Sequence, residues 1–291
     1  MVQIIDILNQ SSNQPFIVCD FSPPRGPIYD DPFDPIDLTP DAFSVAYSPG
    51  RSVRVNPVVT AHWLQVKTQI PAIFTLATRD MNQLALEGLI LGAQVLGLDN
   101  MVSVAGDPFS RQESKKLAVC RNITSTEFVK YAKLMNQRLD FRSRWLNYPT
   151  NLCVGATMDL NKNWNSEIDL TQSKISAGSD FFLAQPVFDA CAPRKFLENY
   201  EDRIGQKITI PVMWGIQMMT RNSTSLVSIP ESMKYNLIKG ADPVEVAVTM
   251  IEEYRKNGFQ YFYLIFYYHC LFHLIYQNIF YYQSIIKFQK F

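Results

Sequence analysis

Charged side chains come directly after short apolar runs at three places in this chain. Arg79 and Asp80 follow one such run, Asp107 follows the next, and Asp20 stands near the end of an earlier one. A carboxylate in such a position is costly to bury unless it is paired or keeps its proton, so Asp20 is a candidate acid–base group. The alternative is that these residues only form turns and caps. Asp80, for example, is placed to cap the helix that follows it.

The segment over residues 73–108 places two of these groups on one structural unit. Apolar runs at 73–77 and 101–105 have the length of buried strands, and a helix between them ends at Gly97. Charged groups at the C-terminal ends of successive parallel strands form the active site of a βα barrel. The helical spacing predicts one apolar face on this helix, made of Leu84, Ala85, Leu89, Gly92, Ala93 and Leu96.

Strand and helix patterns alternate along the rest of the chain. This alternation, without a glycine-rich nucleotide-binding fingerprint, favours an α/β fold: a single (βα)8 TIM barrel over residues 15–265 rather than an open dinucleotide-binding sheet. Residues 1–14 are interpreted as an N-terminal extension and residues 266–291 as an aromatic-rich tail. Strands are predicted at 15–21, 42–46, 73–77, 101–105, 151–156, 181–184, 208–213 and 259–265, and further helices at 57–68, 127–137, 167–177, 193–204 and 244–256.

Charge and cysteine content exclude several classes of function. The chain has 27 Lys and Arg against 27 Asp and Glu, so it lacks the excess of positive charge that binding to nucleic acid by counterion release requires. Five cysteines without CxxC spacing and only three histidines favour free thiols in a reducing compartment over disulfides or a metal site. The N-terminal segment shows no secretory signal. We therefore expect a cytoplasmic protein.

The C-terminal segment is unusual because residues 257–286 contain no charged side chain and are rich in Phe and Tyr. Its length would suffice for a membrane span of about 20 residues. However, His269, His273, Gln277 and several tyrosines make a membrane anchor the least favoured interpretation. A divergent last strand and helix of the barrel, and an aberrant tail outside the domain, remain as alternatives.

Six segments at the predicted strand ends resemble methylenetetrahydrofolate reductase. They occur in the order of that family, over residues 15 to about 265. They are Phe21-Ser22-Pro23-Pro24-Arg25-Gly26, Tyr47-Ser48-Pro49-Gly50-Arg51, Thr78-Arg79-Asp80-Met81-Asn82, Val104-Ala105-Gly106-Asp107-Pro108, the stretch from Ala177 to Asp189 containing Gln185-Pro186, and Pro211-Val212-Met213-Trp214-Gly215-Ile216.

The resemblance implies a barrel that binds FAD, takes hydride from NAD(P)H and reduces 5,10-methylenetetrahydrofolate to 5-methyltetrahydrofolate. Asp20 falls at the position of the family's acid catalyst, which is usually Glu. Asp107 matches the aspartate that binds the pterin and tunes the flavin, so it is also assigned to catalysis. Gln185 matches the glutamine that faces both flavin and folate.

Further cofactor contacts follow from the same resemblance. Lys174 matches a lysine that meets the FAD diphosphate, and Glu167 matches an acid that contacts the cofactor's hydroxyls. Ala46, Ala105 and Gly106 also fall at cofactor-binding positions, with Ala46 and Ala105 in place of Thr and Arg. These two departures, together with Asp20 in place of the usual Glu, motivate an alternative, a flavin-free folate-binding barrel that acts as a partner subunit. The tail motivates another, an inactive truncated homologue. Family members also lead us to expect a homo-oligomer.

Overall fold

A single closed barrel of parallel strands forms the body of the protein. The computed structural model describes residues 2–9, 15–27, 40–120, 122–219 and 229–266. Neighbouring strands pair in chain order, and the last pairs with the first, which confirms the expected (βα)8 TIM barrel. The strands are β1 (Phe16–Phe21), β2 (Ala42–Val45), β3 (Ala72–Ala77), β4 (Asn100–Val104), β5 (Cys153–Met158), β6 (Phe181–Ala184), β7 (Val212–Met218) and β8 (Tyr261–Phe266).

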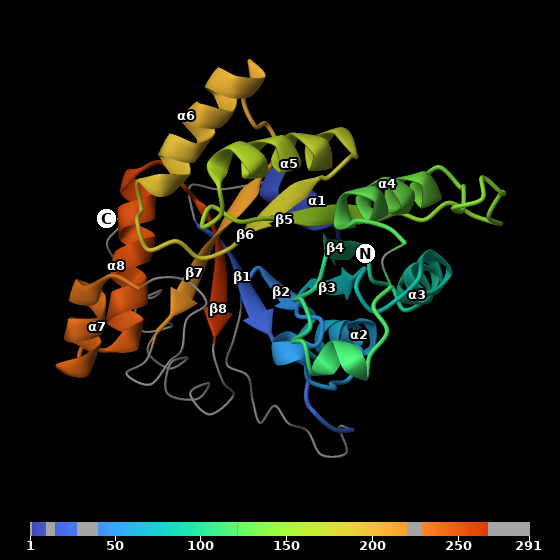
Figure 1. Ribbon diagram of the computed structural model, residues 1–291, viewed down its shortest axis with the longest axis horizontal. Coiled ribbons are helices and arrows are strands. Elements are labelled where there is room, and N and C mark those ends of the chain that lie inside the picture. Colours follow the sequence, from blue (N-terminus) through green and yellow to red (C-terminus); the bar gives the residue numbers. More distant parts are fainter. Residues whose placement is uncertain (1, 10–14, 28–39, 121, 220–228, 267–291) are drawn as a thin grey trace.

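From β2 onward, helices cover the outside of the barrel between successive strands (Figure 1). None of the described helices is long and apolar enough to span a membrane. The helices of this outer layer are α2 (Pro57–Thr68), α3 (Gln83–Val95), α4 (Ser125–Asn136), α5 (Trp164–Ser176), α6 (Ala192–Ile204), α7 (Glu231–Ile238) and α8 (Pro243–Lys256), and short 3-10 turns lie at Pro49–Arg51 and Glu113–Lys115.

The alternation of side chains along each strand separates two apolar layers. In β1, Val18 belongs to a cluster inside the barrel, whereas Cys19 and Phe21 belong to the larger cluster between strands and helices. Asp20 has the same parity as Val18, so its side chain lies on the inner side, near the C-terminal end of the strand. The inner cluster also contains Phe16, Ala42, Ile73, Val102, Cys153, Phe181, Leu183 and Met213.

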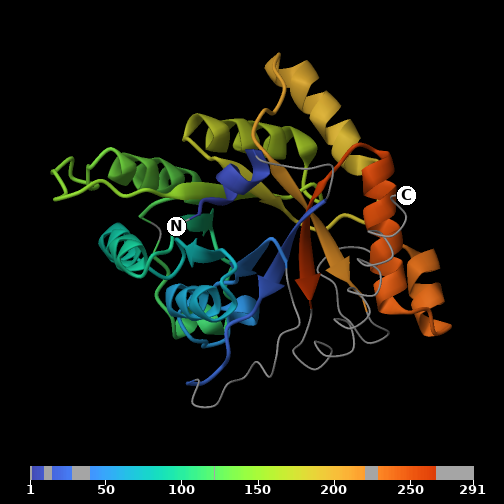
Figure 2. The same cartoon turned by 180° about the vertical axis from the view of Figure 1, so that it is seen from behind.

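A short N-terminal helix, α1 (Ile4–Asn9), closes the end of the barrel opposite the C-terminal strand ends (Figures 1 and 2). Ile4 and Leu8 are buried in the inner cluster. The Ile4 backbone N–H donates to Oδ1 of Asn100, at the start of β4, over 2.9 Å. The opposite end of the barrel, formed by the C-terminal strand ends, is called the mouth below.

Several local predictions were wrong in instructive ways. The seventh strand runs Val212–Met218 instead of 208–213, because Trp214, Gly215 and Ile216 continue the strand where the sequence suggested its end. Asp80 does not cap α3; the Asn82 side chain does, accepting from the Ala85 N–H.

The buried face of α3 also differs from the predicted one. It is formed by Leu86, Ile90 and Ala93, while Leu84 is 66% exposed. Apolar residues occur on more than one side of α3, so the spacing alone does not decide which stripe packs inward. Helix α7 was not predicted, and the aromatic tail from 267 onward lies outside the described residues.

Candidate active site at the barrel mouth

Asp20 lies inside the barrel at the end of β1, and it is 9% exposed. The Tyr263 hydroxyl, from β8, donates to Oδ1 of Asp20 over 2.6 Å. Burial raises the pKa of Asp20 from 3.8 to about 6, and the Tyr263 hydrogen bond opposes part of that rise. Asp20 is therefore a carboxyl group that can both hold and release a proton near neutral pH, as a general acid must.

The turn after β4 carries Gly106 and Asp107. Gly106 has φ +84, and a Cβ there would lie 3.1 Å from Cβ of Arg79 and 3.2 Å from Cβ of Ala77, so glycine allows the turn to lie against the end of β3. Asp107 and Ala105 are exposed at the mouth. The Asp107 carboxylate is thus accessible to a ligand.

Arg79 fixes this turn from the neighbouring strand. Its Nη1 donates to the Asp107 backbone carbonyl, and its guanidinium stacks over the Phe109 ring, 4.2 Å from the ring centroid. The same guanidinium forms a fork with both Asp80 oxygens at 2.6 Å. Asp80 also accepts a hydrogen bond from Tyr47; burial first, and then the Asp80 charge, raises the pKa of Tyr47 to about 12. The ends of β2, β3 and β4 are joined through this network.

Gln185 follows β6 and is half-buried at the mouth. Its backbone N–H donates to the Met158 carbonyl over 2.7 Å. On the other side, Gly215 of β7 packs directly against this backbone: a Cβ there would lie 2.4 Å from the Ala184 oxygen and 2.8 Å from the Gln185 carbonyl carbon. Because Gly215 has no side chain, the backbone of Gln185 can lie in this position against β7.

Glu167 and Lys174 lie beneath the loop between β5 and α5. They are only 2% and 4% exposed. The Lys174 ammonium donates to the Thr157 backbone carbonyl, and a Glu167 oxygen accepts from the Asp159 N–H at 3.0 Å. Burial, the first cause in each case, raises the pKa of Glu167 and lowers that of Lys174, while the attraction between the two charges opposes both changes. Their bonds hold α5 to the end of β5.

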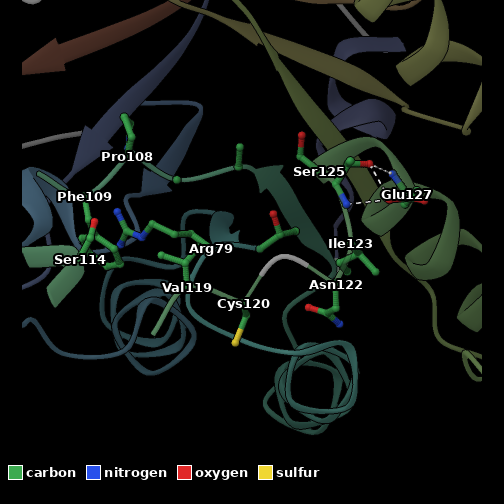
Figure 3. Close-up of a pocket in the computed structure, with 14 residues that line it drawn as sticks. Arg79, Pro108, Phe109, Ser114, Val119, Cys120, Asn122, Ile123, Ser125 and Glu127 are labelled. Atoms are coloured by element: carbon green, nitrogen blue, oxygen red, sulfur yellow. Dashed lines mark hydrogen bonds between the residues drawn. The ribbon is translucent and has the colours of Figure 1, made fainter. Parts of the chain in front are cut away.

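A cavity of about 470 Å³ opens beside the turn after β4 (Figure 3). Arg79, Gly106 and Phe109 line one side, and the residues leading into α4 line the other. This size is typical of a pocket for a small organic molecule. Backbone N–H groups at the start of α4 already have hydrogen-bond partners, because Thr124 and Glu127 form a reciprocal capping box there. The acidic cap makes this helix end unsuited to an anion.

The residues expected to contact FAD lie in two different environments. Ala46, Ala105 and Gly106, after β2 and β4, carry little or no side chain and are half-buried or exposed. Lys174, the cation expected to meet the diphosphate, is instead buried against Thr157. As arranged here, Lys174 and Glu167 do not fit a role at the ligand surface.

The sequence comparison agrees with this architecture. Residues 4–265 match a family model described as methylenetetrahydrofolate reductase. The chain belongs to the methylenetetrahydrofolate reductase family. The matched segment runs from α1 to β8, so the family match covers the described barrel and its N-terminal plug. No curated protein matches the chain in sequence. The roles of the individual site residues stay predictions.

Solved structures show the same fold at low sequence identity. An uncharacterized protein from Clostridium thermocellum that binds two copies of 5-methyl-5,6,7,8-tetrahydrofolic acid is 14% identical, with a TM-score of 0.61 over 93% of this chain and 94% of that one. A 2,3-dimethylmalate lyase of the PEP mutase/isocitrate lyase superfamily is 10% identical, with a TM-score of 0.52 over 98% and 86%. Oxaloacetate acetylhydrolase is 8% identical, with a TM-score of 0.53 over 99% and 85%.

The structure adds two features to the site that sequence reasoning missed. One is Tyr263, which had been counted among the aromatic residues of the C-terminal segment. A signal was present: Tyr261 and Tyr263 alternate with Phe262 and Leu264, which places both hydroxyl-bearing rings on the inner side of the strand. The other is the contact between Arg79 and the Asp107 carbonyl, which joins neighbouring strands and has no local sequence signal.

Proposed function

We propose that this protein reduces 5,10-methylenetetrahydrofolate to 5-methyltetrahydrofolate, with Asp20 as the acid. The observation that carries the proposal is the buried Asp20 carboxyl at the barrel mouth, with a pKa of about 6. The family match over residues 4–265 supports the choice of a folate substrate. So does the folate bound by the Clostridium thermocellum protein.

Each mouth residue has a task in this proposal. Asp20 gives its proton to the folate nitrogen that must become a leaving group, which opens the one-carbon bridge to an electrophilic iminium. The exposed Asp107 carboxylate accepts hydrogen bonds from the amidine-like edge of the pterin. Gln185, fixed by Gly215, orients the rings. When bound, FAD supplies hydride that it receives from NAD(P)H.

A second candidate is a folate-binding barrel that works without flavin. The burial of Lys174 and Glu167 favours it, because the side chains expected to contact the diphosphate and the hydroxyls of FAD are buried in the protein. Folate binding at Asp107 and Gln185 would be common to both candidates, so only the cofactor separates them.

The visible absorption spectrum of the purified protein, before and after incubation with FAD and gel filtration, tests the first proposal. A flavin band near one per chain that NAD(P)H bleaches supports the reductase. Absence of the band under both conditions, with calorimetric binding of 5-methyltetrahydrofolate retained, favours the flavin-free candidate. Absence of folate binding contradicts both.

A further inference from the structure

Tyr263 connects three neighbouring strands around the acid. It lies on β8, which pairs with β1, and Asp20 of β1 is in turn the register partner of Ser44 on β2. The Tyr263 hydroxyl donates to Oδ1 of Asp20 at 2.6 Å, and a hydrogen bond joins Ser44 to Tyr263. A hydroxyl has one proton to donate, so Ser44 must donate to Tyr263 while Tyr263 donates to Asp20.

This arrangement distinguishes the two carboxyl oxygens of Asp20. Oδ1 accepts the Tyr263 proton, and among the described residues no hydrogen bond reaches Oδ2. In a neutral carboxyl group the carbonyl oxygen is a stronger acceptor than the protonated oxygen, so the Tyr263 hydroxyl favours the form in which Oδ1 is the carbonyl oxygen. The transferable proton therefore resides on Oδ2.

We propose that Tyr263 is the positioning residue of the acid: it holds Oδ1, keeps the transferable proton on Oδ2, and stabilises the carboxylate left after transfer. In that step, which rests on the proposed function, the O–H bond at Oδ2 breaks and an N–H bond forms on the folate. The negative charge that remains on Asp20 is shared with the Tyr263 hydroxyl. Ser44 strengthens that hydroxyl as a donor, because hydrogen bonds in a chain polarise one another.

Among the described residues, Asp20 and Tyr263 act on each other, and the Cys19 thiol, next to Asp20 on β1, acts on Tyr263. Burial, followed by the Asp20 charge and hydrogen bond, raises the pKa of Tyr263 far above its ordinary value. Tyr263 therefore keeps its proton throughout the working range and acts only as a donor toward Asp20.

The test is Tyr263→Phe, which removes the hydroxyl and keeps the ring. Because the hydrogen bond lowers the Asp20 pKa, its loss raises that pKa by about half to one unit. The shift is measured by the ¹³C resonance of the Asp20 carboxyl across pH, in the full chain. The pH profile of turnover moves upward by the same amount, and kcat/KM falls about tenfold.

The matched control is Tyr261→Phe. Tyr261 lies two residues earlier on the same strand and packs edge-on against Phe16, with ring centroids 6.5 Å apart. Its variant leaves the Asp20 titration unchanged. Ser44→Ala provides a second test that is milder for folding, and it moves the Asp20 pKa in the same direction by a smaller amount.

An unchanged Asp20 titration in Tyr263→Phe overturns the inference, whatever the activity. If the wild type neither binds nor reduces a folate, the proposed function fails, while the carboxyl titration still decides the role of Tyr263. An equal shift in the Tyr261 variant also overturns the inference, because it would show that any loss of a hydroxyl from β8 disturbs the acid.

Discussion

Asp20 and Glu167 are two buried carboxyl groups whose pKa is raised mainly by burial, yet they lie in different places. Asp20 is inside the barrel at the end of β1, held by the hydroxyl of Tyr263. Glu167 is on α5, behind the strands, where it accepts from the Asp159 N–H and faces the charge of Lys174. The comparison teaches that a raised pKa alone does not identify a catalytic acid; the acid must also reach the mouth.

The largest expected effect comes from Asp20→Asn. Turnover of 5,10-methylenetetrahydrofolate falls about 100- to 10,000-fold, because the variant keeps the shape and loses the acid. Binding of 5-methyltetrahydrofolate, measured by calorimetry, stays close to wild type. Glu167→Gln is the matched control and retains most turnover. An equal loss of turnover in the two variants would show that Asp20 is no more important for turnover than Glu167.

The second prediction concerns stability against pH. Asp20 has a folded pKa of about 6 against 3.8 when unfolded, so its stabilising contribution is present below pH 3.8 and is lost as the pH rises through about 6. The free energy of unfolding of the wild type therefore falls by roughly 3 kcal/mol across that pH window, and that of Asp20→Asn does not show this fall. Urea unfolding of both proteins across pH measures the difference. Parallel pH dependences would show that the acid is not desolvated as described.

The third prediction is that Gly215→Ala disturbs Gln185. The new Cβ would meet the Ala184 oxygen at 2.4 Å, so the β6 end must move, at a cost of about 1–3 kcal/mol. Folate affinity falls with the displacement of Gln185. Gly88→Ala on α3, where an added Cβ meets nothing within 4 Å, leaves affinity unchanged and gains up to about 1 kcal/mol of helix propensity. Intact folate affinity in the Gly215 variant would show that Gln185 does not contribute to folate binding.

The smallest effect is expected for Lys174→Met. The Lys174 charge holds down the pKa of Glu167, so its removal raises that pKa further and costs about 1 kcal/mol of stability at neutral pH. Folate affinity does not change, because neither group faces the mouth. Thermal denaturation and calorimetry measure the two effects. If the variant keeps its stability and no longer binds FAD, Lys174 binds the FAD diphosphate after all.

The barrel itself could be predicted from sequence because its signals are local. The bounds predicted for α2, which begins at Pro57, and for the apolar strand β6 are those that the structure has. The alternation of such signals fixed the fold class. The ends of β7 could not be read, since an aromatic residue and a glycine continue that strand without a polar boundary.

The site was only partly predictable, for a physical reason. Asp20 lies near the end of β1, and Asp107 and Gln185 follow β4 and β6, so the topology alone brings them to one mouth. The depth at which Lys174 and Glu167 are buried depends on how α5 packs against β5, and the contacts of Arg79 and Tyr263 depend on strand pairing. Such long-range geometry leaves no local pattern in the chain.

The hydrogen bond between Tyr263 and Asp20 joins residues 243 positions apart. Contacts of such sequence separation form late, because the intervening chain must first lose its freedom. Asp20 therefore has its hydrogen-bond donor only in a chain whose last strand, β8, lies between β7 and β1 and closes the barrel.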